Sequence, residues 1–358
     1  MDIGTKDILS KDIATNLPLA GSLAIGSTPF LDPTETLDEL AALDIPAAPQ
    51  MVKASFFEDM IFGAIDGLGF LVAQPEKRRV VVDEDNLGES LARFYELYAA
   101  GDYAFLDPGP RSSRGLRAFL DRARRDPSFG PEFLKAQVVG PLTLAQSLRL
   151  ANGAAAVTDL NLLEALSLGL GAKAARLASQ IRELGRAAVV FIDEPGLTGY
   201  GSAFSSLSSE TVLTYLGQAV SVAKSSGPVW VGCHVCGNTD WGLLAQTGLD
   251  ILNFDAFSHL EAFCLYPREI AAFLEKGGWI AWGITPTEAY EPGLTARGLL
   301  ERLWAGVKPL TRQIDRALLA QRSLYSTSCG LGSLEPERAR AILALLAEVG
   351  QLAKAEFS

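Results

Sequence analysis

Short apolar runs alternate along the chain with longer stretches in which apolar residues recur every three or four positions. The short runs are continuous rather than alternating, which is typical of strands buried on both faces, and the longer stretches predict helices. The clearest predicted helices are Leu160 to Leu184 and Glu335 to Phe357. The predicted strands are Pro18 to Ser27, Ile45 to Gln50, Lys135 to Gly140, Ala187 to Ile192, Val229 to Gly232, Asp250 to Phe254, Trp279 to Gly283 and Leu324 to Ser328.

Strands of this kind separated by helices predict an α/β protein with a parallel sheet. About eight such units favour a TIM (β/α)8 barrel that forms one domain over residues 1–358. A doubly wound open sheet is the alternative. Residues 76–114 depart from this alternation of strands and helices, since they contain a basic cluster, a valine run and a helical stretch. They predict an insertion after the second strand, built from a hairpin and a helix, that either decorates the barrel or covers a substrate.

The composition restricts the cellular location and the classes of binding partner that we expect for this protein. Hydrophobic residues make up 48% of the 358 residues, and the net charge is -11. An acidic chain disfavours binding to nucleic acid and to anionic membranes. Residues 1–16 lack the basic start and the apolar run of a secretory signal, and no window is apolar enough to span a bilayer. We therefore expect a cytoplasmic protein without a nucleic-acid or membrane partner.

Candidate chemistry gathers where the predicted strands end. His234 and Cys236 lie two residues apart, so they point the same way from an extended strand end, whereas Cys233 points into the core. Cys329 follows the last predicted strand, and Asp255 follows the sixth. Because the carboxyl ends of barrel strands converge, these residues predict a tetrahedral zinc site with an open position. Asp255 is either the fourth ligand or a carboxylate that orients the substrate.

These motifs carry a resemblance that spans residues 23–331. The chain resembles the superfamily that contains cobalamin-independent methionine synthase, the methylcobamide:coenzyme M methyltransferases and uroporphyrinogen decarboxylase. The segment from His234 to Asn238, HVCGN, is closer to the coenzyme M methyltransferases. Three others are similar to the methionine synthase barrel, namely Ile25-Gly26-Ser27, Ile192-Asp193-Glu194-Pro195 and Ser328-Cys329-Gly330-Leu331.

The resemblance implies roles for individual residues. His234, Cys236 and Cys329 would hold zinc, with Asp255 at the position of an acidic fourth ligand. Ile25, Gly26, Ser27 and Asp193 would bind the amino acid part of a homocysteine-like thiol, and Asp193 and Asp255 are the candidate catalytic carboxylates. Gln50 lies near a family glutamate that binds the amino group, and its neutral amide leaves the acceptor open between homocysteine-like and coenzyme-M-like thiols.

The departures from the family concern the methyl donor. Ala145-Gln146-Ser147 lacks the family tryptophan that stacks on folate, and Gly199 stands where the family has a glutamate that contacts the pterin. We therefore expect a zinc-dependent methyltransferase that acts on a small thiol, with a methylcorrinoid, delivered by a corrinoid protein, favoured over folate as donor. The alternatives are a non-catalytic zinc-binding barrel and a decarboxylase-like member, and the zinc residues disfavour the decarboxylase.

Overall fold

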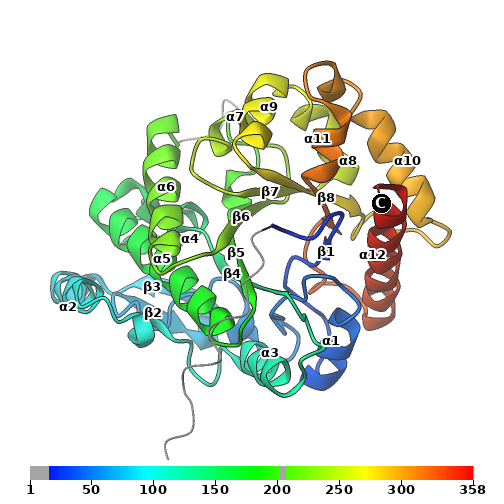
Figure 1. The fold of residues 1–358 in the computed structure, drawn as a ribbon. Helices are drawn as coiled ribbons and strands as arrows, with labels where there is room; N and C mark the ends of the chain where they lie inside the picture. Colours follow the sequence, from blue (N-terminus) through cyan, green and yellow to red (C-terminus); the bar gives the residue numbers. More distant parts are fainter. Residues whose placement is uncertain (1–15, 202–206, 358) are drawn as a thin grey trace, which may run out of the picture.

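In the computed structural model, the chain forms a curled parallel sheet flanked by helices (Figure 1). The structure describes residues 16–201 and 207–357. The order of the seven strands is β1-β9-β8-β7-β6-β5-β4, and all neighbouring pairs are parallel. The strands are β1 (Ser22–Leu23), β4 (Phe133–Val139), β5 (Ala187–Asp193), β6 (Trp230–Val235), β7 (Ile251–Phe254), β8 (Trp279–Thr285) and β9 (Ser323–Thr327).

The segment 45–50 lies between the two edge strands, β1 and β4. Ile45 pairs in parallel with Leu23 of β1, and Ala47 pairs in parallel with Lys135 of β4. The backbone N–H of Ala48 donates to the carbonyl of Lys135 at 2.8 Å. This segment therefore occupies the place expected of the second strand, and the arrangement is consistent with a TIM-like barrel.

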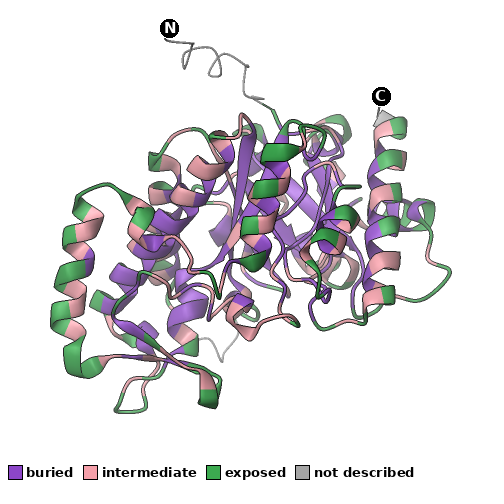
Figure 2. Ribbon diagram, turned by 90° about the horizontal axis from the view of Figure 1, so that it is seen from below, coloured by how far each residue is buried: buried purple, intermediate pink, exposed green. Residues whose placement is uncertain are grey.

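Helices cover the outer face of the sheet, with buried faces toward the strands and exposed faces toward solvent (Figure 2). Most residues of helix α5 are buried, and Asp159 caps its start by accepting from the backbone N–H groups of Asn161 and Leu162. The helices are α1 (Pro33–Leu40), α2 (Leu87–Ala99), α3 (Arg114–Arg125), α4 (Pro141–Ser147), α5 (Leu160–Arg182), α6 (Ser209–Ser225), α7 (Trp241–Leu244), α8 (Ala256–Phe263), α9 (Pro267–Glu275), α10 (Ala296–Gly306), α11 (Arg316–Gln321) and α12 (Pro336–Phe357).

The segment between the second strand position and β4 stands apart from the sheet. An antiparallel hairpin, β2 (Leu71–Gln74) with β3 (Arg79–Val82), precedes α2, and both lie beside α5 at the margin of the molecule (Figure 1). The hairpin and the helix follow the sequence prediction, although the hairpin begins before residue 76. That residues 76–114 are an insertion relative to other barrels stays a prediction.

The interior of the curled sheet is packed by a cluster of apolar side chains. Phe133, Phe191 and Leu324 belong to this cluster and are almost fully buried. Lys135 is also fully buried there, with its ammonium 4.4 Å from the ring centroid of Phe191. The packed interior leaves the carboxyl ends of the strands as the place for a site. Within the described ranges, no helix combines the length and the apolar character needed to cross a bilayer.

Candidate metal centre

Three side chains with metal-ligating atoms converge at the carboxyl ends of β6 and β9. His234 is the penultimate residue of β6, Cys236 follows that strand, and Cys329 follows β9. Their ligand atoms all lie within 4.8 Å of one another. His234 Nε2 is 3.2 Å from Cys236 Sγ, which is 3.4 Å from Cys329 Sγ. In a zinc tetrahedron these ligand-to-ligand edges are about 3.6–3.8 Å, so small side-chain adjustments accommodate the ion.

The two thiols lie within hydrogen-bonding distance of each other. The hydrogen bond from Cys236 lowers the pKa of Cys329, with His234 adding to the effect against the opposing influence of burial. The same hydrogen bond and burial raise the pKa of Cys236. The lowered pKa of Cys329 favours its thiolate, which is the form that binds metal.

His234 is oriented by a residue that the sequence analysis did not assign. Its Nδ1 lies 2.6 Å from Asn253 Oδ1 in β7. The Asn253 amide nitrogen donates to the Ala281 carbonyl and to Ser326 Oγ, both at 2.7 Å, which identifies Oδ1 as the acceptor facing His234. Nδ1 therefore carries the proton, and the Nε2 lone pair points toward the two sulfurs. Metal-ligating histidines are commonly fixed in this way by their second nitrogen.

Asp255 is not brought into this group. It follows the last residue of β7 and caps helix α8, where its Oδ1 accepts from the backbone N–H of Ser258 at 2.9 Å. Among the described residues, the His/Cys/Asp/Glu cluster contains His234, Cys236 and Cys329 without Asp255. Its predicted roles as ligand and catalytic carboxylate have no support from this geometry.

Asp193 and Glu194 point to opposite sides, as expected from the strand alternation. Asp193 ends β5, pairs in register with His234 and is 6% exposed. Burial raises the pKa of Asp193, while Lys135 and His234 lower it. Glu194 instead accepts from the backbone N–H groups of Leu142 and Thr143 at the start of α4, at 3.0 and 2.7 Å. Asp193 is thus available to a ligand, and Glu194 has a structural role.

The segment Ile25-Gly26-Ser27 lies against the turn that follows Cys329. Ser27 Oγ accepts from the Gly332 N–H at 3.3 Å. A Cβ at Gly330 would lie 2.1 Å from Ser27 Oγ, so a side chain at this position would displace the Ser27 hydroxyl. A backbone hydrogen bond of 3.0 Å from Gln50 to the carbonyl of Gly26 fixes the second strand position beside them.

A cavity of about 290 Å³ opens onto the two sulfurs. Its wall includes all the predicted metal ligands except Asp255, and also Ile25, Ser27, Gln50 and Asp193. Asp59 and Met60 line it as well, although no sequence motif marked them. Both residues belong to the segment that joins the second strand position to the hairpin. Their contacts with the cavity are long-range in sequence, and strand periodicity does not predict them.

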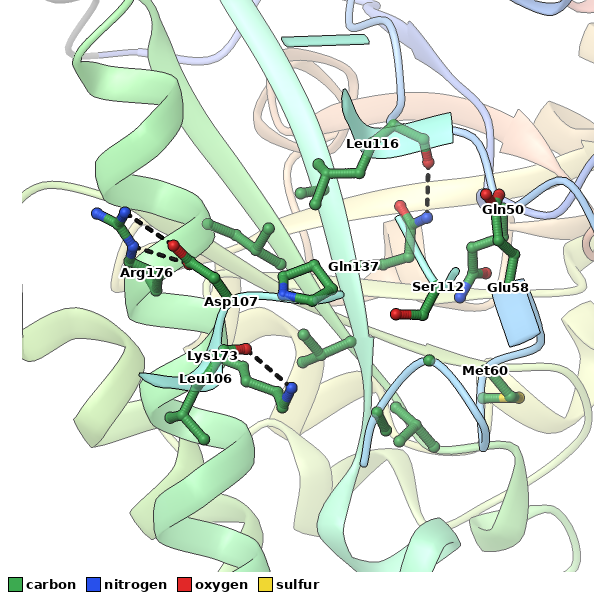
Figure 3. A pocket seen from close by; sticks show the side chains of 18 of the residues that line it. Gln50, Glu58, Met60, Leu106, Asp107, Ser112, Leu116, Gln137, Lys173 and Arg176 are labelled. Carbon is green, nitrogen blue, oxygen red and sulfur yellow. Dashed lines mark hydrogen bonds and ion pairs between the residues drawn. The ribbon is translucent and has the colours of Figure 1, made fainter. Parts of the chain in front are cut away.

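A smaller cavity of about 90 Å³ adjoins the first one, and Gln50 and Met60 line both. Figure 3 shows this second cavity between β4, α5 and the segment that contains Glu58 and Ser112. Its polar groups are largely engaged with each other. The Arg176 guanidinium donates two hydrogen bonds to Asp107, and Lys173 Nζ donates to the Leu106 carbonyl at 3.0 Å.

Other residues considered from the sequence pack away from the cavity. Cys233 is fully buried in the core, as predicted. Trp282 is also fully buried, and its Nε1 donates to Ser323 Oγ at 2.8 Å. Trp282 and Thr285 belong to β8 and are absent from the described cavity wall. The Gly- and Ser-rich composition of residues 196–206 suits either a cover over the site or a surface loop without function. This segment lies partly outside the described residues, which exclude 202–206.

Comparison with solved structures gives a likeness that concerns the fold. A B12-independent methionine synthase from Shewanella sp. W3-18-1, solved in complex with selenomethionine, is similar over 94% of this chain and 98% of its own, with 15% identity and a TM-score of 0.55. The two proteins share a fold. This finding agrees with the superfamily resemblance at that level.

The remaining comparisons add little. An endo-beta-1,4-mannanase from Cellulomonas fimi and a double mutant of it match 68% and 69% of this chain, with TM-scores of 0.39 and 0.36, which are too low to carry an argument. No protein-family model matches the sequence, and the search of curated proteins returns no match.

Proposed function

We propose that the protein is a zinc-dependent methyltransferase that moves a methyl group to a small-molecule thiol. The observation that carries the proposal is the convergence of His234 Nε2, Cys236 Sγ and Cys329 Sγ within 4.8 Å at the mouth of a cavity. One nitrogen and two sulfurs from separate strand ends are typical of a catalytic zinc site, which keeps one position for substrate. The fold shared with a methionine synthase also supports it.

His234, Cys236 and Cys329 would hold the ion, and their donor set suits Zn²⁺. Bound zinc would supply a Lewis acid that keeps the substrate sulfur in its thiolate form at neutral pH. The two cysteines are half-buried and line the cavity, whereas His234 is 2% exposed, so a substrate would approach the ion from the cavity.

The residues around the cavity would position the thiol. Asn253 holds the histidine tautomer, and Asp193 presents a buried carboxylate oxygen that accepts no hydrogen bond from the described residues. Ser27 and Gln50 add polar groups to the same wall. Such positioning lowers the entropic cost of bringing sulfur and methyl carbon into line.

For the methyl donor we propose a methylcorrinoid carried by a partner protein. The two positions at which the resemblance places folate contacts hold small or polar residues here, namely Ala145-Gln146-Ser147 and Gly199. In the reaction the thiolate electron pair forms the new S–CH3 bond, the Co–C bond breaks, and its electron pair stays on cobalt as Co(I). The thiol proton passes to solvent.

The test combines metal analysis with a transfer assay. We expect the purified protein to contain stoichiometric zinc. X-ray absorption at the zinc edge should show that the zinc gains one sulfur neighbour when the acceptor thiol is added. A Co(I) absorption band should appear when methylcobalamin is also present. Purified protein without zinc after anaerobic zinc supplementation would overturn the proposal. Zinc whose coordination ignores every thiol offered would favour a non-catalytic zinc-binding barrel instead.

A further inference from the structure

The cavity of about 90 Å³ lies where the second strand position and β4 come apart, and we call it the seam cavity (Figure 3). The segment 45–50 pairs with β4 near its start, where the Ala48 N–H donates to the Lys135 carbonyl at 2.8 Å. Two residues later the N–H of Gln50 turns to the other side and donates to the Gly26 carbonyl at 3.0 Å. Beyond Ala48, no backbone hydrogen bond within the described ranges joins this segment to β4.

Two residues account for the opening between the segment and β4. Pro49 has a fixed φ and no N–H group, and proline interrupts the pairing of strands for these reasons. Gln137 of β4 donates from its side-chain Nε2 to the Ala48 carbonyl at 2.7 Å, so a side chain replaces the backbone contact. The space that results extends outward to α5, which contributes Lys173 to its wall.

Most side chains in the wall of the seam cavity are apolar, and they include Ala64, Leu106, Leu116, Val138 and Leu177. They come from four separate segments, namely the stretch before the hairpin, the stretch before α3 with the start of α3, β4, and α5. A ligand with an apolar body would therefore meet apolar side chains from several directions, and its burial there would be favourable.

Three other charged side chains line the seam cavity, and each is held by the protein. Glu58 accepts from two backbone N–H groups, at 2.8 and 3.0 Å. Arg176 donates two hydrogen bonds to Asp107, at 2.9 and 3.0 Å. The charges of these groups are thus compensated where they lie, and Lys173 is the charged group that remains for a ligand.

The side chain of Lys173 extends from α5 toward the middle of the seam cavity (Figure 3). It is 6% exposed, and its Nζ donates to the Leu106 carbonyl at 3.0 Å. An ammonium has three N–H donors, and Lys173 forms no further hydrogen bond and no ion pair with the described residues. Burial lowers its pKa to about 8, so the group is charged at neutral pH. A buried charge without a counter-ion in contact costs free energy, which an anion placed against it would offset.

The seam cavity adjoins the larger cavity at the candidate metal centre. Gln50 and Met60 line both cavities. Met60 is half-buried, and its unbranched side chain has three rotatable bonds, so it adapts to a group that passes beside it. A small molecule therefore has a route to Lys173 from the barrel mouth.

We propose that the seam cavity binds a small carboxylate with a short apolar body, whose carboxylate oxygens accept hydrogen bonds from Lys173 Nζ. A cavity of about 150 Å³ holds benzene, so a volume of about 90 Å³ suits a body of about three or four carbons. The site is distinct from the group formed by His234, Cys236 and Cys329, and this inference does not depend on the proposed methyl transfer.

Three small molecules test the inference with the purified full-length protein in ligand-observed NMR titrations. Butyrate carries a charge, butyramide has the same carbon chain without the charge, and benzoate carries the charge on a larger body. Butyrate should bind about tenfold or more tightly than butyramide, as expected for hydrogen bonds between charged groups, and more tightly than benzoate. Equal binding of butyrate and butyramide, or no binding of butyrate, would overturn the inference. Tighter binding of benzoate would refute the proposed size of the ligand.

Three variants assign the binding to the seam cavity. Lys173→Met keeps an unbranched chain without the charge and should abolish the preference for butyrate over butyramide. Lys276→Met makes the same change at an exposed lysine at the end of α9 and should keep that preference. Ala64→Leu leaves Lys173 in place but fills part of the cavity, and it should abolish butyrate binding. Circular dichroism checks that each variant is folded. Full butyrate binding in a folded Lys173→Met or Ala64→Leu protein would place the anion elsewhere and overturn the inference.

Cys236→Ser separates this site from the candidate metal centre. The variant lacks one of the proposed zinc ligands and should bind butyrate as tightly as the unchanged protein does. Loss of butyrate binding in this variant would place the anion at the metal centre and overturn the inference. Protein that takes up no zinc but binds butyrate through Lys173 would overturn the proposed function alone, and protein that holds zinc but binds no butyrate would overturn this inference alone.

Discussion

Replacing Asn253 by alanine should weaken zinc binding without touching a ligand. Asn253 is fully buried and makes three short hydrogen bonds, at 2.6 Å to His234 Nδ1 and at 2.7 Å to the Ala281 carbonyl and Ser326 Oγ. Alanine removes the acceptor that fixes the imidazole tautomer. The His234 ring is then no longer oriented, and its Nε2 lone pair is no longer held ready to bind zinc. Residues in this position typically contribute about 10–100-fold to metal affinity.

The same substitution should also lower stability by an amount that can be estimated from the contacts. Three buried partner groups lose their hydrogen bonds, and each costs about 1 kcal/mol or somewhat more when left unpaired. The free energy of unfolding should therefore fall by about 3–4 kcal/mol. A competition titration against a chelator measures the zinc affinity, and denaturant unfolding measures the stability.

Asn253→Asp separates the two effects. Aspartate retains an oxygen acceptor for His234 Nδ1, but it cannot donate to the Ala281 carbonyl. It should lose stability as alanine does while holding zinc more tightly than the alanine variant. A folded Asn253→Ala protein with the zinc affinity of the unchanged protein would refute the reasoning, because His234 would then need no orienting partner.

Three further predictions concern separate parts of the molecule. Cys236→Ser should abolish stoichiometric zinc, whereas Cys264→Ser, a change at a buried cysteine in another part of the fold, should retain it, as measured by metal analysis. Glu194→Gln should lower the melting temperature, because the amide replaces one carboxylate oxygen by an NH2 group. This donor would face a backbone N–H at the start of α4 and lower the free energy of unfolding by about 1–3 kcal/mol. Burial lowers the pKa of Lys173 to about 8. Below pH 8 the lysine is charged in both the folded and the unfolded protein, and the folded protein carries the full free-energy cost of burying this charge. Between pH 8 and the unfolded value near 10.5 only the folded form loses the proton, so stability rises with pH. The difference in free energy of unfolding between Lys173→Met and the unchanged protein should therefore change by about 3 kcal/mol over this pH range, as measured by denaturant titrations. A difference that stays constant with pH would contradict the burial argument.

Much of the candidate site could be predicted because strand periodicity is a local property. Residues two apart on a strand point the same way, which places His234 and Cys236 together and turns Asp193 and Glu194 to opposite sides. The convergence of strand ends, in contrast, does not bring Asp255 to the candidate metal centre. The strand ends at Phe254, the chain turns at Asp255 to begin α8, and beyond a strand end the alternation no longer holds.

The contacts that the sequence did not reveal all join distant segments. Asn253 was visible as a polar residue in a buried strand, but only the neighbouring strands β6 and β8 show what it binds. Asp59 and Met60 carry no motif, and their place at the cavity depends on how the segment after the second strand position folds back over the barrel mouth. No periodic pattern encodes such a path.

The sequence by itself determined the strand and helix order, the parallel α/β class and the three candidate metal ligands, since these depend on short-range alternation and on residue chemistry. Only the tertiary structure decided which groups surround them. The curvature of the sheet brings the ends of β6 and β9 together, the turn after β7 removes Asp255, and the fold of the segment 51–64 adds Asp59. These outcomes depend on the packing of the whole chain, because each is fixed by contacts between residues far apart in the sequence.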